Sequence, residues 1–584
     1  MSDPTAVSAP SQSSAAGSPS GAPTSADLDR MLHVWQSRFT GGRSPSTVGL
    51  AWLDWAVHAA NAPFQSASLG RDAMAQWLRL SKLALADEPV IQPDAGDRRF
   101  SHSGWSHRPY SLLAQAALLG EEWWDLAVRT PPGVSRYNRR IVEAGLRRVL
   151  DQASPSNLPW LNPEVIEATR ASGGANLAAG LDNFLRERTG SPREEADARP
   201  AYELGRDVAA TPGKVVFRNA MFELIQYSPA TDAVWAEPVL MVPAWIMKYY
   251  ILDLTPKDSM VRWLVERGHT VFAISWRNPD AGMREATLED YRVQGVMAAI
   301  EAVSAIGGGA RIHAVGYCLG GTLLTMAAAA MARDGDDRLA SLSLFAAQTD
   351  FTEAGELLQF ITEDQLDFLD DIMKTQGYLD SAQMAGAFQM LRPRDMIWTK
   401  AIHEYLLGER ERSNPLLAWN ADGTRMPARM HIEYLRGMFL HNDLAEGRFR
   451  VEGRPLSLGD IRAPIFLVGT EADHIAPWRS VYKLHGLNGG ALTFVLASGG
   501  HNAGIVSEPG HPHRHYRIGT RAVGAPTPGR GEWEAAATRV EGSWWPAWGD
   551  WLAARSGDRV APPPMGGADY PPLADAPGDY VRQA

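Results

Sequence analysis

The stretch that decides the fold reads Val315-Gly316-Tyr317-Cys318-Leu319-Gly320-Gly321 and holds the only cysteine of the chain. An apolar run at 312–315 predicts a strand before it, and an amphipathic segment at 321–333 predicts a helix after it. A residue on such a sharp strand-to-helix turn needs small neighbours two positions away on each side, because larger side chains would collide with the strand or the helix. Gly316 and Gly320 meet this need. The segment therefore predicts that Cys318 is a nucleophile on a strand–turn–helix elbow.

A buried structural cysteine is the alternative interpretation, and it is the commoner fate of a free thiol. Glycine makes up 54 of the 584 residues, so glycines on both sides at this spacing arise by chance at roughly 1 cysteine in 100. The catalytic interpretation is therefore favoured. In it, the backbone N–H of Leu319 points at a developing oxyanion, together with a second donor from the loop after an earlier strand.

Short apolar runs alternate with helical patterns on both sides of the elbow. The runs predict strands at 215–217, 222–227, 239–242, 271–275, 312–315, 339–345, 465–468 and 492–496, and helices are predicted at 259–267, 288–306 and 321–333. This alternation indicates parallel βαβ units. The first two runs are only four residues apart, too close for a crossover, so they predict an antiparallel hairpin. The fold class is α/β, with a mostly parallel sheet.

The remaining segments give the domain organisation. Ser, Ala, Pro, Gly and Thr fill 22 of the first 26 positions, a composition that predicts a disordered tail over 1–26. Helical periodicity, broken by proline-containing stretches, predicts an N-terminal helical region over 27–205. The catalytic domain is expected over 206–584. Within it, a long helical block at about 350–446 interrupts the alternation and predicts a cap, or lid, over the active edge of the sheet.

A thiolate nucleophile needs a base and an acid that orients the base, and this architecture predicts the chain order nucleophile, acid, histidine. Asp473 follows the strand at 465–468, and His501 follows the strand at 492–496 after a pair of glycines. We expect His501 to be the base and Asp473 the acid. Glu471 is a competing acid, Asp473 could instead cap a helix before Pro477, and His474 could be a supporting hydrogen-bonding residue.

Composition excludes several classes of protein. The 56 Lys and Arg against 67 Asp and Glu give a net charge of −11, which argues against nucleic-acid binding. We expect no membrane span and no secretory signal, since neither pattern occurs, and a lone cysteine rules out an internal disulfide. The histidine-rich tract at 511–515 is interpreted as a solvated loop without a metal, the glycines at 307–309 as a turn, and the 20 tryptophans mainly as core residues.

Cysteine in place of serine has a chemical consequence. An acyl-cysteine is a thioester and keeps its transfer potential, whereas an acyl-serine is an oxoester. A thiol enzyme of this shape is therefore suited to take an acyl group from coenzyme A and pass it to a hydroxyl. Thiol-dependent hydrolysis is the alternative, and a closed apolar lid would disfavour it by excluding water.

Several motifs occur together in an order that resembles the polyhydroxyalkanoate synthases of the long single-subunit type, class I, from about residue 90 to 582. They are Asp97-Arg98-Arg99-Phe100, Pro155-Ser156-Asn157, Asn162-Pro163-Glu164, Lys248-Tyr249-Tyr250-Ile251-Leu252-Asp253-Leu254, Ser275-Trp276-Arg277-Asn278-Pro279-Asp280, Gly316 to Gly321, Leu391-Arg392-Pro393, Asp473-His474-Ile475-Ala476-Pro477-Trp478 and Gly542-Ser543-Trp544-Trp545-Pro546.

The resemblance implies an α/β-hydrolase-like core with a helical lid and an N-terminal helical region. It also implies an acyltransferase that polymerises (R)-3-hydroxyacyl-CoA into polyester and releases CoA, with no cofactor besides the thioester substrate. Cys318 would be the nucleophile, His501 the base, and Asp473 either the residue that orients His501 or one that activates the 3-hydroxyl. The implied partners are the growing polyester, the granule surface and a second protomer, and the implied location is the cytoplasm, at the surface of polyester inclusions.

Two departures from the family pattern affect the site. Residues 242–250 read Val-Pro-Ala-Trp-Ile-Met-Lys-Tyr-Tyr where such synthases often have Val-Pro-Pro-x-Ile-Asn-Lys-Tyr-Tyr, so Ala244 and Trp245 stand in the loop expected near the second oxyanion donor. Asn502, after His501, replaces the usual apolar residue. Two other functions remain open: a thiol-dependent esterase or depolymerase on the same fold, and a non-catalytic protein that binds polymer through exposed aromatic side chains.

Overall fold

An eleven-stranded sheet forms the centre of the structure, a computed structural model that describes residues 24–40, 43–86, 89–93, 97–189, 202–391, 397–409 and 414–584. Its strands are β1 (Gly213–Arg218), β2 (Phe222–Tyr227), β4 (Val239–Val242), β5 (Val271–Trp276), β6 (Ile312–Tyr317), β7 (Leu339–Phe345), β12 (Ile465–Thr470), β13 (Leu492–Ala497), β14 (His515–Arg521), β15 (Thr538–Glu541) and β17 (Ala574–Asp575). They lie in the order β15-β14-β13-β12-β7-β6-β4-β5-β2-β1-β17. The strands from β5 through β13 in this order pair in parallel, and the pairs towards both edges are antiparallel.

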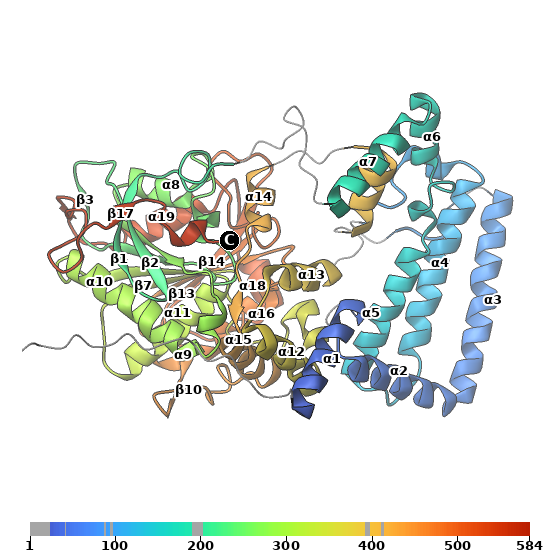
Figure 1. Ribbon diagram of the computed structural model, residues 1–584, viewed down its shortest axis with the longest axis horizontal. Coiled ribbons are helices and arrows are strands. Elements are labelled where there is room, and N and C mark those ends of the chain that lie inside the picture. Colours follow the sequence, from blue (N-terminus) through green and yellow to red (C-terminus); the bar gives the residue numbers. More distant parts are fainter. Residues whose placement is uncertain are drawn as a thin grey trace, which may run out of the picture.

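The central strands are buried along their whole length, since helices cover both faces of the sheet. Helices α8 (Met260–Glu266) and α19 (Trp545–Ala553) lie on one face, and α10 (Ala298–Ile306) and α11 (Leu319–Arg333) lie on the other (Figure 1). The predicted α/β sheet and its opening hairpin, β1 with β2, are confirmed. The helix expected over 288–306 contains a π-helical segment, Tyr291–Met297, between α9 (Leu288–Asp290) and α10.

Three strands of the sheet were not predicted: β14, β15 and β17. Arg517 and Arg539 interrupt the apolar pattern of β14 and β15, because these strands lie towards an edge where one face meets solvent. Arg521, at the end of β14, is instead buried and donates to the backbone carbonyls of nearby loops. The tract at 511–515 was interpreted as a loop, and this is wrong at its last residue. His515 begins β14, and its Nε2 lies 3.3 Å from a carboxylate oxygen of Glu471.

The block between β7 and β12 is largely helical, as expected of a cap. Its helices are the 3-10 helix η7 (Gly355–Phe360), α12 (Glu363–Gln376), α13 (Ser381–Leu391), the π-helix η9 (Ala401–Leu406), α14 (Pro415–Ala421), α15 (Ala428–Tyr434), the π-helix η10 (Leu435–Leu440) and the 3-10 helix η11 (Leu458–Asp460). Two small ladders accompany them, β8 (Tyr378–Leu379) with β9 (Met426–Pro427) and β10 (Arg450–Val451) with β11 (Arg454–Pro455). Residues 392 and 393 of the motif at 391–393 lie outside the described residues.

The N-terminal region is a set of helices beside the cap (Figure 1). They are α1 (Ser25–Thr40), α2 (Pro45–Ala60), α3 (Pro63–Ala86), α4 (Tyr110–Arg129), α5 (Arg136–Gln152), α6 (Pro163–Ser172) and α7 (Ala175–Thr189). The region contacts the cap at several places. His33 of α1 lies 2.9 Å from Asp371 of α12, and Asn183 of α7 donates to the Glu404 carbonyl of η9 at 2.9 Å. The N–H of Ser44, just before α2, donates to Oε1 of Gln365 of α12 at 2.8 Å.

Two boundaries bear on the expected domains. Helix α1 begins at Ser25, inside the stretch expected to be a disordered tail, and the rest of that stretch, 1–23, lies outside the described residues. So do 190–201, near the expected start of the catalytic domain. Within the part of the chain that the structure describes, no helix combines the length and apolar character needed to cross a lipid bilayer.

Candidate active site

Cys318 lies on the predicted elbow, between the end of β6 and the first residue of α11. Its φ of 53° and ψ of −126° place a non-glycine residue in a strained region of backbone space, which is typical of a nucleophile on this kind of turn. A Cβ on Gly316 would lie 2.4 Å from the Cα of Gly321, and one on Gly320 would lie 2.2 Å from the Val242 carbonyl oxygen. Both positions therefore require glycine, for the steric reason expected from the sequence.

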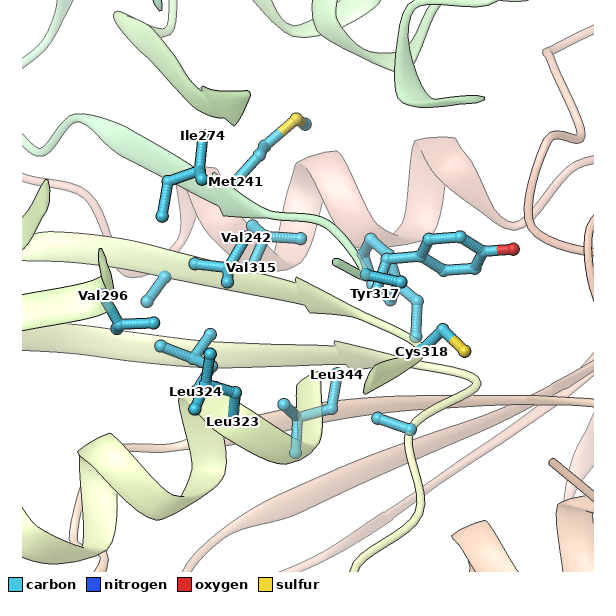
Figure 2. Close-up of a cluster of buried hydrophobic side chains, with 14 of the residues drawn as sticks. Met241, Val242, Ile274, Val296, Val315, Tyr317, Cys318, Leu323, Leu324 and Leu344 are labelled. Atoms are coloured by element: carbon cyan, nitrogen blue, oxygen red, sulfur yellow. The ribbon is translucent and has the colours of Figure 1, made fainter. Parts of the chain in front are cut away.

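The thiol lies at the margin of the hydrophobic core. Figure 2 shows Cys318 at the end of its strand, with the sulfur directed away from Val315, Leu344 and the other labelled side chains. Cys318 is 9% exposed and forms no disulfide. The side chain is thus largely shielded from solvent but accessible from the cavity that it lines.

His501 and Asp473 are joined across the two loops predicted to carry them. Nδ1 of His501 lies 2.7 Å from Oδ2 of Asp473, and both residues are buried. The other oxygen of Asp473 accepts the N–H groups of Ile475 and Ala476, each at 2.8 Å. Asp473 therefore closes a local turn before Pro477 and also contacts the histidine. It does not cap the helix that follows, because the N-cap of α16 (Trp478–Val481) is Pro477.

The electrostatics of this pair favour a charged histidine. Burial alone would lower the pKa of His501, but Asp473 and then Cys318 outweigh it and raise that pKa well above the ordinary value. Burial would likewise raise the pKa of Asp473, yet His501 and the two backbone N–H donors hold it below the ordinary value. The arrangement is suited to move a proton from the thiol of Cys318 to the imidazole and to keep the resulting imidazolium.

The other candidates near the site fit less well. Glu471 contacts His515 rather than His501. His431 of α15 lines the same cavity as Cys318, but burial lowers its pKa to about 3, which makes it a poor proton acceptor. Among the residues that the structure describes, no group of three or more His, Cys, Asp or Glu side chains is placed to hold a metal ion.

The expected oxyanion loop packs directly against the elbow. The carbonyl oxygens of Val242 and Pro243 lie close to Gly320, so the chain after β4 passes beside the first turn of α11. Ala244 and Trp245 are buried, and the Trp245 carbonyl accepts a hydrogen bond from Thr424 of the cap at 2.8 Å. The Leu319 N–H stands at the N-terminus of α11, where backbone donors favour an anion.

A cavity of about 360 Å³ opens above Cys318. The elbow contributes Leu319 and Thr322 to its wall, the loop after β4 contributes Ile246, and the cap contributes mainly apolar side chains from η7, α12, α13, α15 and η10. Ser37 of α1 also lines it. Cys318 is therefore enclosed by the sheet edge, the cap and the first N-terminal helix. Ala244 and Trp245 are not among the lining residues, whereas their neighbour Ile246 is.

Comparison with known proteins identifies the family. Models described as the N-terminus of poly-beta-hydroxybutyrate polymerase match residues 96–264 and 22–65, and the alpha/beta hydrolase fold matches 237–508. The chain is 42% identical to a poly(3-hydroxyalkanoate) polymerase of Methylorubrum extorquens over 92% of this chain and 89% of that protein. It is 35% identical to the polymerase subunit PhaC of Cupriavidus necator over 94% of this chain and 93% of that one. The chain belongs to the poly(3-hydroxyalkanoate) polymerase family.

Membership in the polymerase family confirms the resemblance, the α/β-hydrolase fold and the expected class of enzyme, an acyltransferase of the synthase type. The structure also shows contacts around the site that the sequence did not predict. Trp544 and Trp545 are buried, as expected of core residues, but their Nε1 atoms donate to the carbonyls of Gly504 and Ile505, each at 2.9 Å. They therefore fasten the loop that carries His501.

The contacts of Tyr317, the residue before Cys318, were also not predicted. Its ring lies against the ring of His501, with 5.7 Å between centroids, and its hydroxyl donates to Oδ1 of Asn502 at 2.6 Å. The departure of Asn502 from the family pattern was the one signal in the sequence that pointed here. Its partner could not be found from sequence, because 185 positions separate the two residues.

Proposed function

We propose that this polymerase-family enzyme joins (R)-3-hydroxyacyl units from coenzyme A thioesters into polyester, through an acyl-cysteine at Cys318. The observation that carries the proposal is the placement of a free thiol on a strained elbow, beneath an apolar cavity and beside a histidine paired with a buried carboxylate. The names of the relatives support the same reaction.

The reaction has two steps at one sulfur atom. His501 takes the thiol proton, Sγ of Cys318 attacks the thioester carbonyl, and the thiolate of CoA leaves with the proton that His501 returns. The 3-hydroxyl of another unit then attacks the acyl-cysteine, forms an ester and regenerates the thiol. Backbone N–H groups at Leu319 and in the loop holding Ala244 and Trp245 would stabilise the oxyanion in each step.

For Asp473 the geometry supports the role that orients His501, because one carboxylate oxygen faces Nδ1 and the other is occupied by two backbone N–H groups. A carboxylate engaged on both oxygens has little capacity left to activate the 3-hydroxyl directly. We therefore assign activation of that hydroxyl to His501.

The apolar cavity favours polymerisation over the alternative, thiol-dependent esterase or depolymerase activity. An acyl-cysteine enclosed by carbon-rich walls meets little water, so the competing nucleophile is a hydroxyl delivered with the substrate. We further propose that the enzyme needs no cofactor beyond its thioester substrate, and that it works as a homodimer at the surface of polyester inclusions in the cytoplasm, as the family implies.

The test is CoA release from (R)-3-hydroxybutyryl-CoA, followed with a thiol reagent, with mass analysis of the acyl product and Cys318→Ala as the control. Insoluble polyester formed by the wild type and lost in the variant is the expected result. Free 3-hydroxybutyrate without polymer would instead establish the hydrolase. No release across a panel of acyl lengths would overturn the proposal and favour a binding protein.

A further inference from the structure

The contact with Asp473 does not by itself fix the orientation of the His501 ring. A single contact at Nδ1 lets an imidazole tilt about that contact, so a second contact is needed to fix the direction of Nε2. Tyr317 supplies it: its ring lies at 32° to the imidazole, with 5.7 Å between the ring centroids. Because Tyr317 directly precedes Cys318, the surface that supports the base belongs to the same turn as the nucleophile.

Tyr317 is tied to the histidine loop as well as touching it. Its hydroxyl donates to Oδ1 of Asn502, the residue after His501, at 2.6 Å. Burial, together with the charges of Cys318 and Asp473, raises the pKa of Tyr317 well above its ordinary value, so the phenol remains a neutral donor. Tyr317 is 2% exposed, which leaves its hydroxyl little access to water if Asn502 is removed.

Asn502 is in turn anchored by its own backbone. Its carbonyl accepts the N–H groups of Ile505 at 3.1 Å and Val506 at 2.9 Å, so it begins the short turn that Trp544 and Trp545 fasten to α19. The hydrogen bond from Tyr317 therefore ends on a rigid part of the loop. It links the end of β6 to the loop after β13, which the sheet order separates by β7 and β12.

We propose that Tyr317 and Asn502 are positioning residues, whose hydrogen bond couples the nucleophile turn to the histidine loop and holds His501 in line with Cys318. The proposal extends the proposed function, since it assumes that Cys318 and His501 react together. It gives a positioning role to Asn502, which replaces the apolar residue that is usual in the family.

The test uses the single cysteine of the chain, because alkylation of thiols by iodoacetamide then reports on Cys318 without a contribution from other cysteines. The variants are Tyr317→Phe, Asn502→Leu, the double variant, and Asn502→Asp, which retains an acceptor. We expect Asn502→Leu to slow alkylation and kcat about 10-fold, since it strands a buried hydroxyl, and Tyr317→Phe to slow them about 5-fold. KM is expected to stay within about twofold, because neither residue lines the cavity.

The double variant is the decisive arm. Both substitutions break the same hydrogen bond, so the double variant is expected to be about as slow as Tyr317→Phe and faster than Asn502→Leu, and Asn502→Asp is expected to remain within about 3-fold of wild type. Tyr482→Phe is the matched control, as it removes a tyrosine hydrogen bond, to the Pro528 carbonyl, from a residue outside the cavity wall. It should leave both rates unchanged.

Multiplicative losses in the double variant, or single variants that lose thermal stability while alkylation and kcat remain normal, would overturn the proposal. Alkylation does not depend on polyester synthesis. If the wild type released no CoA while the alkylation pattern held, the proposed function would fail and the positioning role would stand.

Discussion

Nδ1 of His501 lies 2.7 Å from Oδ2 of Asp473, although the two residues stand on loops after different strands. The contact exists because β12 and β13 are parallel neighbours, which brings their carboxyl ends to one edge of the sheet. The pair is buried, so its charge state governs both proton transfer and folding stability.

Asp473→Asn keeps the size of the side chain but removes the charge that stabilises the imidazolium. We expect kcat for CoA release to fall by about 10³-fold or more, with KM little changed. The matched control is Glu471→Gln, two positions away, which contacts His515 and should stay within about twofold of wild type. The reverse pattern would make Glu471 the orienting acid.

The pair also predicts a dependence of stability on pH. The pKa of His501 is raised in the folded state, so its contribution is complete below its ordinary pKa of 6.5 and is lost as pH rises through the folded value. The pKa of Asp473 is lowered, so its contribution is present above 3.8 and is lost as pH falls through the folded value. The difference in Tm between wild type and His501→Gln should therefore be largest between these two ordinary pKa values and shrink as pH rises through the folded pKa of His501. A difference that grew with pH would contradict this.

The elbow predicts a steric effect at Gly320. A methyl group there would meet two backbone carbonyls, at 2.2 and 2.4 Å, neither of which can move without shifting β4. Gly320→Ala should lower the free energy of unfolding by at least about 2 kcal/mol. Gly120→Ala is the control: within α4, with no atom beyond the neighbouring residues and backbone of its own helix within 4 Å of the added Cβ, it should be neutral or stabilising. Denaturant titration of both variants measures the two changes in the free energy of unfolding. Equal changes would mean that the elbow has room for a side chain at position 320.

The two tryptophans that donate from α19 to different partners allow a paired test. Trp545 donates to the Ile505 carbonyl in the histidine loop, whereas Trp548 donates to Ser343 of β7. We expect Trp545→Phe to lower kcat about 10-fold. Trp548→Phe should lower the free energy of unfolding about as much as Trp545→Phe does, but without the loss of kcat. Equal kcat values in the two variants would mean that the loop is held in other ways.

Much of the fold follows from local sequence because the central strands are continuous apolar runs. Strands β2, β4 and β7 have the predicted bounds, since all lie in the buried part of the sheet. The strands β14, β15 and β17 escaped prediction because they lie towards the two edges of the sheet, where polar residues such as Arg517, Arg539 and Asp575 break the apolar pattern. Their pairing with the sheet is decided by tertiary contacts that no local pattern records.

The site was predictable to the extent that it depends on chain order. The glycine spacing indicated Cys318, and the sequence of strands indicated Asp473 and His501, which the structure brings into contact. The hydrogen bond from Tyr317 to Asn502 could not be predicted, because only the order of strands in the sheet brings these two residues together. The same limit applies to Ser37, which reaches the cavity wall from a helix near the start of the chain.

The contact between α1 and α12 has a consequence for biosynthesis. His33 and Asp371 are 338 positions apart, so at ribosomal rates of 5–20 residues per second α1 waits roughly 20 to 70 s for the helix that covers it. During that interval Leu32 and Trp35, which remain about half exposed even in the finished protein, have no cap to pack against. The nascent chain therefore exposes an apolar helix face, and the cavity at Cys318 is completed only after most of the polypeptide has been made.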